Sequence, residues 1–347
     1  MTLDAAQREL QCVACGGQCV YAPDARALRC TSCATTQHIA IDPDADPARE
    51  FHYAPELPHT EQTTIEKIRT HQCETCGGQV VFTGPALSER CAYCDGPVFL
   101  QESEASYQTM AVIPFQIADK TAQALALAWG QARLAAPNDL QAILEKGRVA
   151  GIYVPFWTFD MQEFLDYTVR YRVKRGKRWY NRSTSGKMNI AFDDLLAPAS
   201  HHITPLIRDG ILHEFDPEKL RPYRPEYLAG FAAERHHQNV AEGLSANQAD
   251  KDLLIRNRIK QSVRKNNITN VSYKTHTTGI RYRRILLPVW ILHYTYQDKA
   301  KKVVVCGLHG RTFGERPFST WKLAGYAAAI SLGAILIGWA WGAAQFI

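Results

Sequence analysis

The sequence lacks the short motifs that identify many common catalysts. It has no Gly-x4-Gly-Lys-Ser/Thr loop for nucleotide phosphates, no Gly-x-Ser-x-Gly nucleophile elbow and no His-Glu-x-x-His zinc-protease helix. The missing phosphate loop argues against a P-loop helicase or other nucleotide hydrolase of that class. We therefore expect a protein that is not an enzyme.

The N-terminus also lacks the marks of a secretory signal. Met1 to Leu10 contain neither a basic start nor an apolar run, so we expect the N-terminal part to stay in the cytoplasm. Thiols remain reduced there, and ten cysteines in such a compartment indicate metal binding before disulfides. The net charge of +6 over 347 residues is too small to imply nucleic acid by itself.

Eight of the ten cysteines form two units with the same spacing, Cys-x2-Cys-x14-Cys-x2-Cys, offset by 61 positions. Zinc binds four thiolates in a tetrahedron, and two residues between cysteines let one tight turn present both sulfurs. The pattern predicts two tandem zinc ribbons, at residues 1–40 and 71–100, and two Zn²⁺ ions. Their predicted ligands are Cys12, Cys15, Cys30 and Cys33, and Cys73, Cys76, Cys91 and Cys94.

Other residues of the repeat also correspond. Gly16 and Gly77 follow the second cysteine of each unit, where positive φ would turn backbone N–H groups towards the thiolates. Arg29 and Arg90 precede the third cysteine, and we expect them to offset the net −2 charge of a zinc tetrathiolate. Apolar residues at 20–21 and 80–82 predict short strands between the knuckles.

The two remaining cysteines fall outside this pattern. Cys19 aligns with Val80 and is interpreted as a strand residue, and Cys306 lies in an apolar run that predicts core. Redox activity of the thioredoxin kind would need a βαβ context, which the sequence does not show. Four thiolates leave no open coordination position, so we expect structural sites.

Residues 41–70 are rich in Pro, Asp and Glu and predict a linker, with a short helix at Thr63–Thr70. Residues 101–318 predict an α+β domain with an antiparallel sheet. Its first elements are a strand at Met110–Phe115, a helix at Asp119–Leu134 with Asp119 as its cap, and a helix at Asn138–Lys146.

Two distant segments, Gly151–Trp157 and Arg284–Trp290, share an apolar-Pro-apolar-Trp core. We expect both to be strands of that sheet, with the prolines at edges or bulges. A turn at Gln297–Lys299 would make the second segment part of a hairpin. The insertion between them, Glu226–Lys265, has a mostly helical pattern.

Arg170 to Lys187 contains eight Lys or Arg residues with Tyr171, Trp179 and Tyr180 interleaved. Three interpretations remain open: contact with anionic lipid headgroups, binding of nucleic acid by charge and stacking, or a solvated hairpin rim. The candidate contact residues are Arg170, Arg172, Lys174, Arg175, Lys177, Arg178 and Arg182.

A second metal or catalytic site is a weaker alternative. Its candidates are two histidine pairs and one aspartate pair: His201 and His202, His236 and His237, and Asp193 and Asp194. Adjacent residues on one strand or helix point apart, and no ligand spacing links the groups.

The last 25 residues, Leu323 to Ile347, contain no charged side chain. A helix of that length spans about 37 Å, more than the roughly 30 Å hydrocarbon core of a bilayer. Arg311, Arg316 and Lys322 precede it and no basic residue follows. Residues 319–347 therefore predict one transmembrane helix in the inner membrane, with the bulk of the chain in the cytoplasm. The alternative is a buried core helix.

Small residues line two ridges of this predicted helix. Gly325, Ala329 and Gly333 form one, and Ala334, Gly338 and Gly342 form the other. Such ridges let transmembrane helices approach closely, so the sequence favours a homo-oligomer.

Together these features resemble a bacterial family of TFIIB-type zinc-ribbon membrane proteins, often labelled primosomal protein N-prime or PriA-helicase-like. The resemblance covers nearly the whole chain. It is carried by the Cys-x-x-Cys-Gly-Gly knuckles, the closing Gly307–Arg316 turn and the terminal helix, with Val154–Trp157, Phe192–Asp194, Tyr227–Phe231 and Leu287–Trp290. The first unit, a complete four-cysteine ribbon, departs from the family pattern. The helicase label has no support, because the nucleotide-binding loop is absent.

The resemblance implies a membrane-anchored adaptor. Some relatives work with phage-shock-type and flotillin-like (SPFH) proteins at stressed membrane. We therefore expect a non-enzymatic scaffold that recruits protein partners to the inner membrane. The alternative is a nucleic-acid-binding zinc-ribbon protein acting at the membrane.

Overall fold

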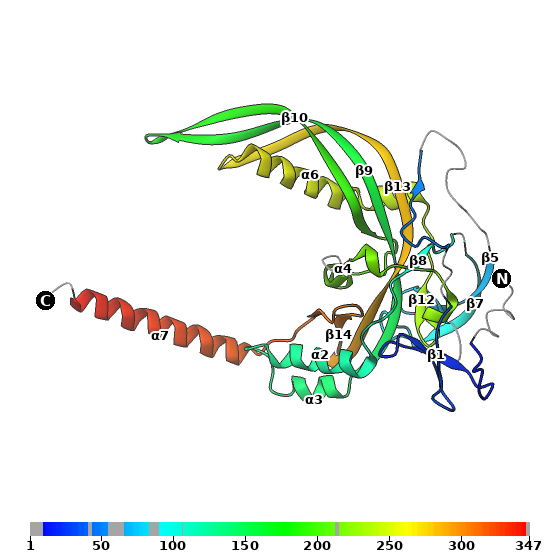
Figure 1. The fold of residues 1–347 in the computed structure, drawn as a ribbon. Helices are drawn as coiled ribbons and strands as arrows, with labels where there is room; N and C mark the ends of the chain where they lie inside the picture. Colours follow the sequence, from blue (N-terminus) through cyan, green and yellow to red (C-terminus); the bar gives the residue numbers. More distant parts are fainter. Residues whose placement is uncertain are drawn as a thin grey trace.

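The computed structural model describes residues 10–40, 44–54, 66–82, 90–105, 107–211 and 215–344. A long twisted sheet forms the body, the two cysteine-rich units lie at one end of it, and the last helix projects away from it (Figure 1). The path of the main sheet is β11-β8-β13-β9-β12-β6-β5-β7, with β4, β10, β14 and β15 attached beside it.

The two longest strands, β9 (Arg148–Arg175) and β13 (Ile268–Tyr296), form the centre of this sheet. They pair antiparallel, with Leu287 opposite Val154. The prediction that the two apolar-Pro-apolar-Trp segments are strands of one sheet is thus confirmed, and the structure shows in addition that they pair with each other. Their long apolar runs are explained by burial on both faces of the sheet.

The sheet is mixed, so the prediction of an antiparallel sheet is only partly right. β12 (Ala232–Glu234) runs parallel to β9, and β8 (Ala111–Val112) runs parallel to β13. In each parallel pair a long stretch of chain lies between the two strands, which permits parallel pairing and which no local pattern reveals.

The prolines lie in central strands, so their predicted edge position is wrong. The Pro155 carbonyl accepts the Ala199 N–H, and the Pro288 carbonyl accepts the Gly307 N–H. In a strand, the N–H and C=O of one residue point the same way. The side of each proline that lacks an N–H therefore faces away from the β9–β13 ladder. On that side one neighbouring strand ends and another begins.

Two hairpins extend the central strands. β10 (Arg178–Pro198) folds back on β9 after a turn at Gly176, and a register shift lies between Phe192 and Leu195. β14 (Lys299–Cys306) folds back on β13, with positive φ at Gln297 and Asp298. This second turn confirms the predicted hairpin.

The helices α2 (Asp119–Gln131) and α3 (Leu140–Glu145) form where the sequence predicts them. The cap of α2 is Ala118, so Asp119 is the first helical residue and its predicted role as cap is wrong. The predicted helix at Glu226–Lys265 is only partly right, because β12 occupies its first part. The helices that follow are α5 (Val240–Ala246), which begins with an Asn239–Glu242 capping box, and α6 (Gln248–Val263).

Short elements complete the body. They are β4 (Phe51–His52), α4 (Pro205–Ile211), η1 (Pro217–Lys219), β11 (Arg221–Pro222), η2 (Pro225–Leu228) and β15 (Thr312–Gly314). β4 pairs with β13, so part of the predicted linker belongs to the main sheet.

The first cysteine-rich unit is a three-stranded sheet of β1 (Cys19–Ala22), β2 (Ala27–Cys30) and β3 (Thr36–Gln37). The second contains β5 (Glu66–Cys73), β6 (Gln79–Phe82) and β7 (Val98–Ala105). β6 pairs with β12 and so joins the second unit to the main sheet. The predicted helix at Thr63–Thr70 is wrong for residues 66–70, which belong to β5, and residues 63–65 lie outside the described part.

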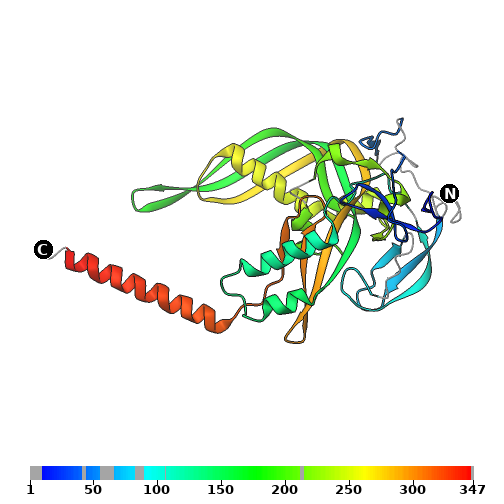
Figure 2. The ribbon, with the colours of Figure 1, turned by 60° about the horizontal axis from the view of Figure 1, so that its bottom comes forward.

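The last helix, α7 (Thr320–Ala344), starts beside α2 and α3 and points away from the body in both views (Figures 1 and 2). The stretch Thr320–Trp339 is long and apolar enough to cross a membrane, and none of it is buried within the described structure. The alternative of a buried core helix is therefore not what the structure shows.

Candidate metal centres

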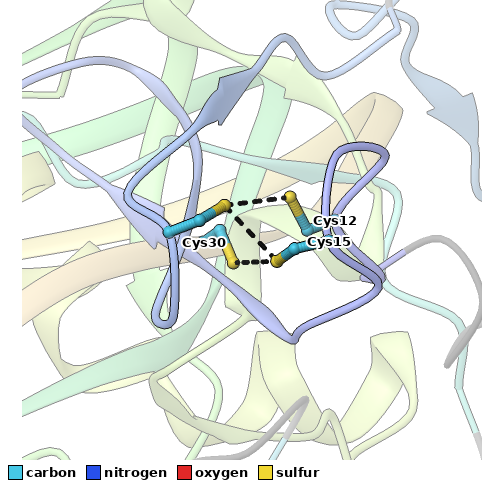
Figure 3. Close-up of side chains that lie close together, drawn as sticks. Cys12, Cys15 and Cys30 are labelled. Atoms are coloured by element: carbon cyan, nitrogen blue, oxygen red, sulfur yellow. Dashed lines mark hydrogen bonds between the residues drawn. The ribbon is translucent and has the colours of Figure 1, made fainter.

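The first cysteine cluster lies between the two knuckles of the first unit. The Sγ atoms of Cys12, Cys15, Cys30 and Cys33 all lie within 4.8 Å of one another. Sγ–Sγ distances are 3.6 Å for Cys12–Cys33, 3.5 Å for Cys15–Cys30 and 3.4 Å for Cys15–Cys33. Figure 3 shows the sulfurs of Cys12, Cys15 and Cys30 turned towards one another. A zinc tetrathiolate with bonds of about 2.3 Å requires sulfurs roughly 3.8 Å apart, which this cluster approaches.

The second cluster repeats this arrangement. Cys73, Cys76, Cys91 and Cys94 also lie within 4.8 Å of one another. The Sγ–Sγ distances are 3.4 Å for Cys73–Cys94 and 3.8 Å for Cys76–Cys91. The structure thus brings all eight predicted ligands into two groups of four, each of a size that could hold one metal ion.

The four knuckles share one backbone turn. In each, the N–H of the fourth residue after the leading cysteine donates to that cysteine's carbonyl. That residue has positive φ in every case: Gly16 at 71°, Ala34 at 59°, Gly77 at 73° and Asp95 at 66°. The sequence predicted the two glycines. It gave no signal for Ala34 and Asp95, which adopt the same conformation at a steric cost.

Backbone N–H groups face the sulfurs, as expected for thiolates. The Gly17 N–H lies 3.4 Å from the Cys15 sulfur, and the Ser32 N–H lies 3.4 Å from the Cys30 sulfur. In the second cluster the Thr75 N–H lies 3.4 Å from the Cys73 sulfur, and the Tyr93 N–H lies 3.3 Å from the Cys91 sulfur. Such donors stabilise negative charge on the sulfur.

The thiols of the first cluster differ in pKa because their sulfurs lie close together and have different hydrogen-bond partners. The hydrogen bond between the Cys33 sulfur and the Thr35 hydroxyl is the largest cause that lowers the pKa of Cys33, to about 6. The Gly17 N–H lowers the pKa of Cys15, but the neighbouring Cys33 and Cys30 sulfurs outweigh it and raise that pKa to about 12. Four thiolates at these distances would repel one another unless a cation neutralised their charge. A bound metal ion supplies such a cation.

The arginines beside the third cysteines have another role than we predicted. Arg29 pairs with Asp24 at 2.7 Å, and Arg90 pairs with Asp95 at 3.0 Å. Each is thus directed to a carboxylate. The sequence missed Arg148 of β9, whose guanidinium binds the Asp95 carboxylate at 2.5 Å and the Cys91 carbonyl at 3.0 Å.

The last knuckle of the second unit is docked on the body by polar contacts. Tyr93 is buried and its hydroxyl donates to Glu234 of β12. His202 lies 3.1 Å from the same carboxylate through Nδ1 and 3.0 Å from the Cys76 carbonyl through Nε2. The hydrogen bond with Glu234 is the largest cause that raises the pKa of His202.

His293 of β13 completes this contact. Its Nε2 lies 2.9 Å from the Ala92 carbonyl, and burial lowers the pKa of His293 to about 4. The neutral ring thus donates one hydrogen bond into the knuckle. The second cluster is held between strands of the main sheet and shares a hydrophobic core with them.

The first unit contacts the body through its strands and leaves its knuckles in solvent. The Tyr21 N–H donates to the Ala229 carbonyl at 2.9 Å, and the Tyr21 hydroxyl donates to the Phe115 carbonyl at 3.2 Å. Gly230 has a φ of 93°, which L side chains rarely adopt, and a Cβ there would lie only 3.2 Å from Val20, a tight contact. On the outer side, Cys15 and Cys33 are exposed and Val13 is 85% exposed.

The other two cysteines stay outside both groups. Cys19 is buried in β1 opposite Cys30, and Cys306 is buried at the end of β14. Both positions agree with the strand and core roles expected from the sequence.

The histidine and aspartate pairs do not assemble into one site. His202 contacts the second unit, whereas His236 is buried with Nε2 3.1 Å from the Phe156 carbonyl. Asp194 pairs with Arg283 and lies near Glu50 and Asp160. His201, His237 and Asp193 are exposed. In the described residues, no metal-sized group combines these histidines and aspartates.

The basic stretch forms the far end of the β9–β10 hairpin, which extends from the body on the same side as α7 (Figures 1 and 2). Trp179 and Tyr180 are exposed beside the turn. All seven candidate contact residues are exposed: Arg170, Arg172, Lys174, Arg175, Lys177, Arg178 and Arg182. The hairpin is free to contact a large anionic partner, and what it binds stays a prediction.

Comparison with known proteins gives no functional name. No family model matches the chain, and no solved structure matches it. The chain is 23% identical over 339 residues to the uncharacterized protein YdjG of Bacillus subtilis (strain 168). The alignment covers 94% of this chain and 95% of that protein.

Proposed function

We propose that the protein is a membrane-anchored scaffold in which two zinc ions fold the ribbons, α7 holds the chain at the inner membrane and the first ribbon recruits a protein partner in the cytoplasm. The observation that carries this proposal is the difference between the two cysteine clusters. One is docked into the body by its last knuckle, and the other presents its knuckles to solvent.

Zinc is the metal that fits the donor set. Four cysteine sulfurs at tetrahedral spacing, with N–H groups facing them, are typical of structural Zn²⁺ sites. With four thiolates bound, zinc keeps no position for substrate or water. Each ion thus stabilises the fold, and function falls to the protein surface around it.

The knuckles of the first ribbon supply that surface. Val13 is a large apolar side chain at a turn whose neighbours Ala14, Cys15 and Gly16 are all exposed. Exposed apolar side chains on a metal-rigidified turn can bind a partner at low entropic cost. By the family resemblance, phage-shock-type or SPFH proteins at stressed membrane are the partners to test first.

The ribbons provide a matched test. Val13 of the first ribbon corresponds to Glu74 of the second, and both are exposed. We expect full-length protein purified from solubilised membranes to retain its partner when Glu74→Arg is introduced and to lose it with Val13→Arg. Both variants should bind two zinc ions. Recovery of no partner by the parent chain, or equal retention by both variants, would contradict the scaffold.

The basic hairpin supports a second candidate function, nucleic-acid binding at the membrane. Its exposed positive and aromatic side chains have the composition of single-strand binding surfaces. The full-length chain should then retain RNA or DNA less tightly as salt rises, and replacing Lys174, Arg175, Lys177 and Arg178 by Gln should flatten that dependence. The same variants tested on phosphatidylglycerol vesicles distinguish headgroup contact. Flat curves at low salt for the parent chain exclude nucleic acid.

Homo-oligomerisation through α7 is a further part of the proposal. Gly325, Gly333 and Gly338 leave open space where a side chain would stand. A neighbouring helix could approach closely there. Substituting Gly333→Ile should then reduce cross-linking of the full-length protein in membranes.

A further inference from the structure

The loop between α2 and α3 is bound to the base of α7. The Ala135 carbonyl accepts the Ser319 N–H at 2.8 Å, the Ala136 carbonyl accepts the Lys322 ammonium at 2.7 Å, and the Leu134 carbonyl accepts the Tyr326 hydroxyl at 2.8 Å. Three successive carbonyls thus bind the first turns of α7. The loop lies at the same level as the start of the apolar helix.

These bonds matter because irregular backbone is costly near lipid unless protein groups satisfy it. Large apolar side chains are also exposed in the loop, in the segment before α7 and in the first turn of α7. Leu134 is 83% exposed, Phe318 is 61% exposed and Trp321 is 87% exposed. Together with the exposed apolar side chains of α7 they make the surface at this end of the molecule largely apolar. Its loop carbonyls are already bound, so it can meet a bilayer without leaving those carbonyls unpaired.

A cavity of about 500 Å³ opens within this surface. Its wall is made of the loop, the segment before α7 and the first turns of α7, including Leu134, Phe318, Leu323 and Tyr326. The volume falls in the range of sites for organic ligands. Only two charged side chains line it, and both are arginines, Arg133 and Arg316.

Neither arginine has an anionic partner among the described residues. Arg133 lies over the Trp129 ring at 5.0 Å, and its buried Nε has no hydrogen-bond partner within the described part of the chain. Neither Arg133 nor Arg316 forms an ion pair with any described residue. A guanidinium binds phosphate with two parallel hydrogen bonds, so a phosphate would supply what this cavity lacks.

We infer that the cavity binds an anionic phospholipid, with its phosphate at Arg133 and Arg316 and the first part of an acyl chain against Leu134, Phe318 and Leu323. This inference rests on the proposed anchoring of α7 in a membrane. Lipid is favoured over a soluble ligand because the apolar wall continues directly into α7. The bound lipid would fix the angle between α7 and the α2–α3 pair.

The test uses full-length protein in nanodiscs of phosphatidylcholine or of phosphatidylcholine with phosphatidylglycerol. Arg316 is exposed, so Arg316→Gln alone should leave the fold intact, and Arg133→Gln is then added. Arg258→Gln with Lys260→Gln, both exposed on α6, is the control of equal charge. Native mass spectrometry counts retained lipid, and thermal unfolding reports its effect on stability.

We expect the parent and the α6 control to retain phosphatidylglycerol over phosphatidylcholine, and the Arg133/Arg316 variant to bind it about tenfold more weakly, as expected from losing a charge-assisted pair of hydrogen bonds. Arg316→Gln should give part of that loss. Equal retention of the two lipids by the parent, or equal loss in the control, would overturn the lipid site alone. Failure of the chain to enter nanodiscs would instead refute the anchor.

Discussion

The two cysteine-rich units, the proposed zinc ribbons, have the same cysteine spacing and the same backbone turn, yet their surroundings differ. In the first, Cys15 and Cys33 are exposed, and the unit meets the body through Tyr21 and the close approach of Val20 to Gly230. In the second, the knuckle around Tyr93 is buried and held by Glu234 and Arg148. A repeated metal motif can thus be a fixed part of the core at one place and a presented surface at another.

The largest contrast is expected from removing the matched outer ligands. Cys76→Ser with Cys94→Ser should release one zinc ion and destabilise the whole body by several kcal/mol, because the second ribbon is continuous with the main sheet through β6. Cys15→Ser with Cys33→Ser should also release one ion but unfold chiefly the first ribbon. Zinc content by mass spectrometry and thermal unfolding check both. Equal loss of stability would remove the distinction between the ribbons.

Acid should weaken the docking of the second ribbon through His293, whose pKa is about 4 when folded. An unfolded histidine has a pKa near 6.5, so between these values the unfolded state binds the extra proton. Stability from this group is complete above pH 6.5 and falls by about 1.4 kcal/mol per pH unit until pH 4. His293→Gln should flatten the profile relative to the parent. Parallel profiles for the variant and the parent would show that protonation of His293 does not contribute to the pH dependence of stability.

Losing Arg148 should affect only the second ribbon. Arg148→Met removes bonds to the Asp95 carboxylate and the Cys91 carbonyl. Because the Arg148 and Asp95 side chains are both partly exposed, we expect a loss of about 1 kcal/mol and faster zinc removal by a chelator from the second site. Arg29→Met, which breaks the exposed pair with Asp24, is the matched control and should change stability by less than about 0.5 kcal/mol. A similar effect of both would contradict the assigned role of Arg148.

The smallest effect concerns the turn positions with positive φ. Ala34→Gly should relieve left-handed strain and stabilise the first ribbon by about 0.5 kcal/mol, the steric gain less the entropy cost of glycine. Asp95→Gly should destabilise the second ribbon, because it removes the carboxylate that binds Arg90 and Arg148. Chelator-driven zinc release measures both. Effects of the same sign would contradict this difference.

The sequence predicted what local spacing determines. Two residues between cysteines define a tight turn, so both clusters and the glycines with positive φ followed from the pattern. That the apolar segments of β9 and β13 belong to one sheet also followed from the pattern, whereas their direct pairing is shown only by the structure. Residues brought together by the fold were missed. Arg148, His202 and His293 contact the second ribbon from positions far along the chain.

The wrong predictions concern residues whose local sequence pattern is overridden by a strand that pairs with them from elsewhere in the chain. The proline rule places proline at sheet edges, but Pro155 and Pro288 lie in central strands at points where the neighbour changes. Residues 66–70 become a strand because β7 pairs with them. Residues 232–234 do so because β9 and β6 lie on either side. Nothing in the intervening sequence encodes such partners.

The pairing of distant strands has a consequence for the order in which the molecule forms. Each cysteine cluster closes a short loop of chain, whereas β4 and β8 must wait for β13, which is made much later during synthesis. Short loops close before long ones. A nascent chain supplied with zinc would therefore carry finished ribbons while its central sheet is still open. Zinc supply during translation, and not only afterwards, would then decide how much of the protein folds.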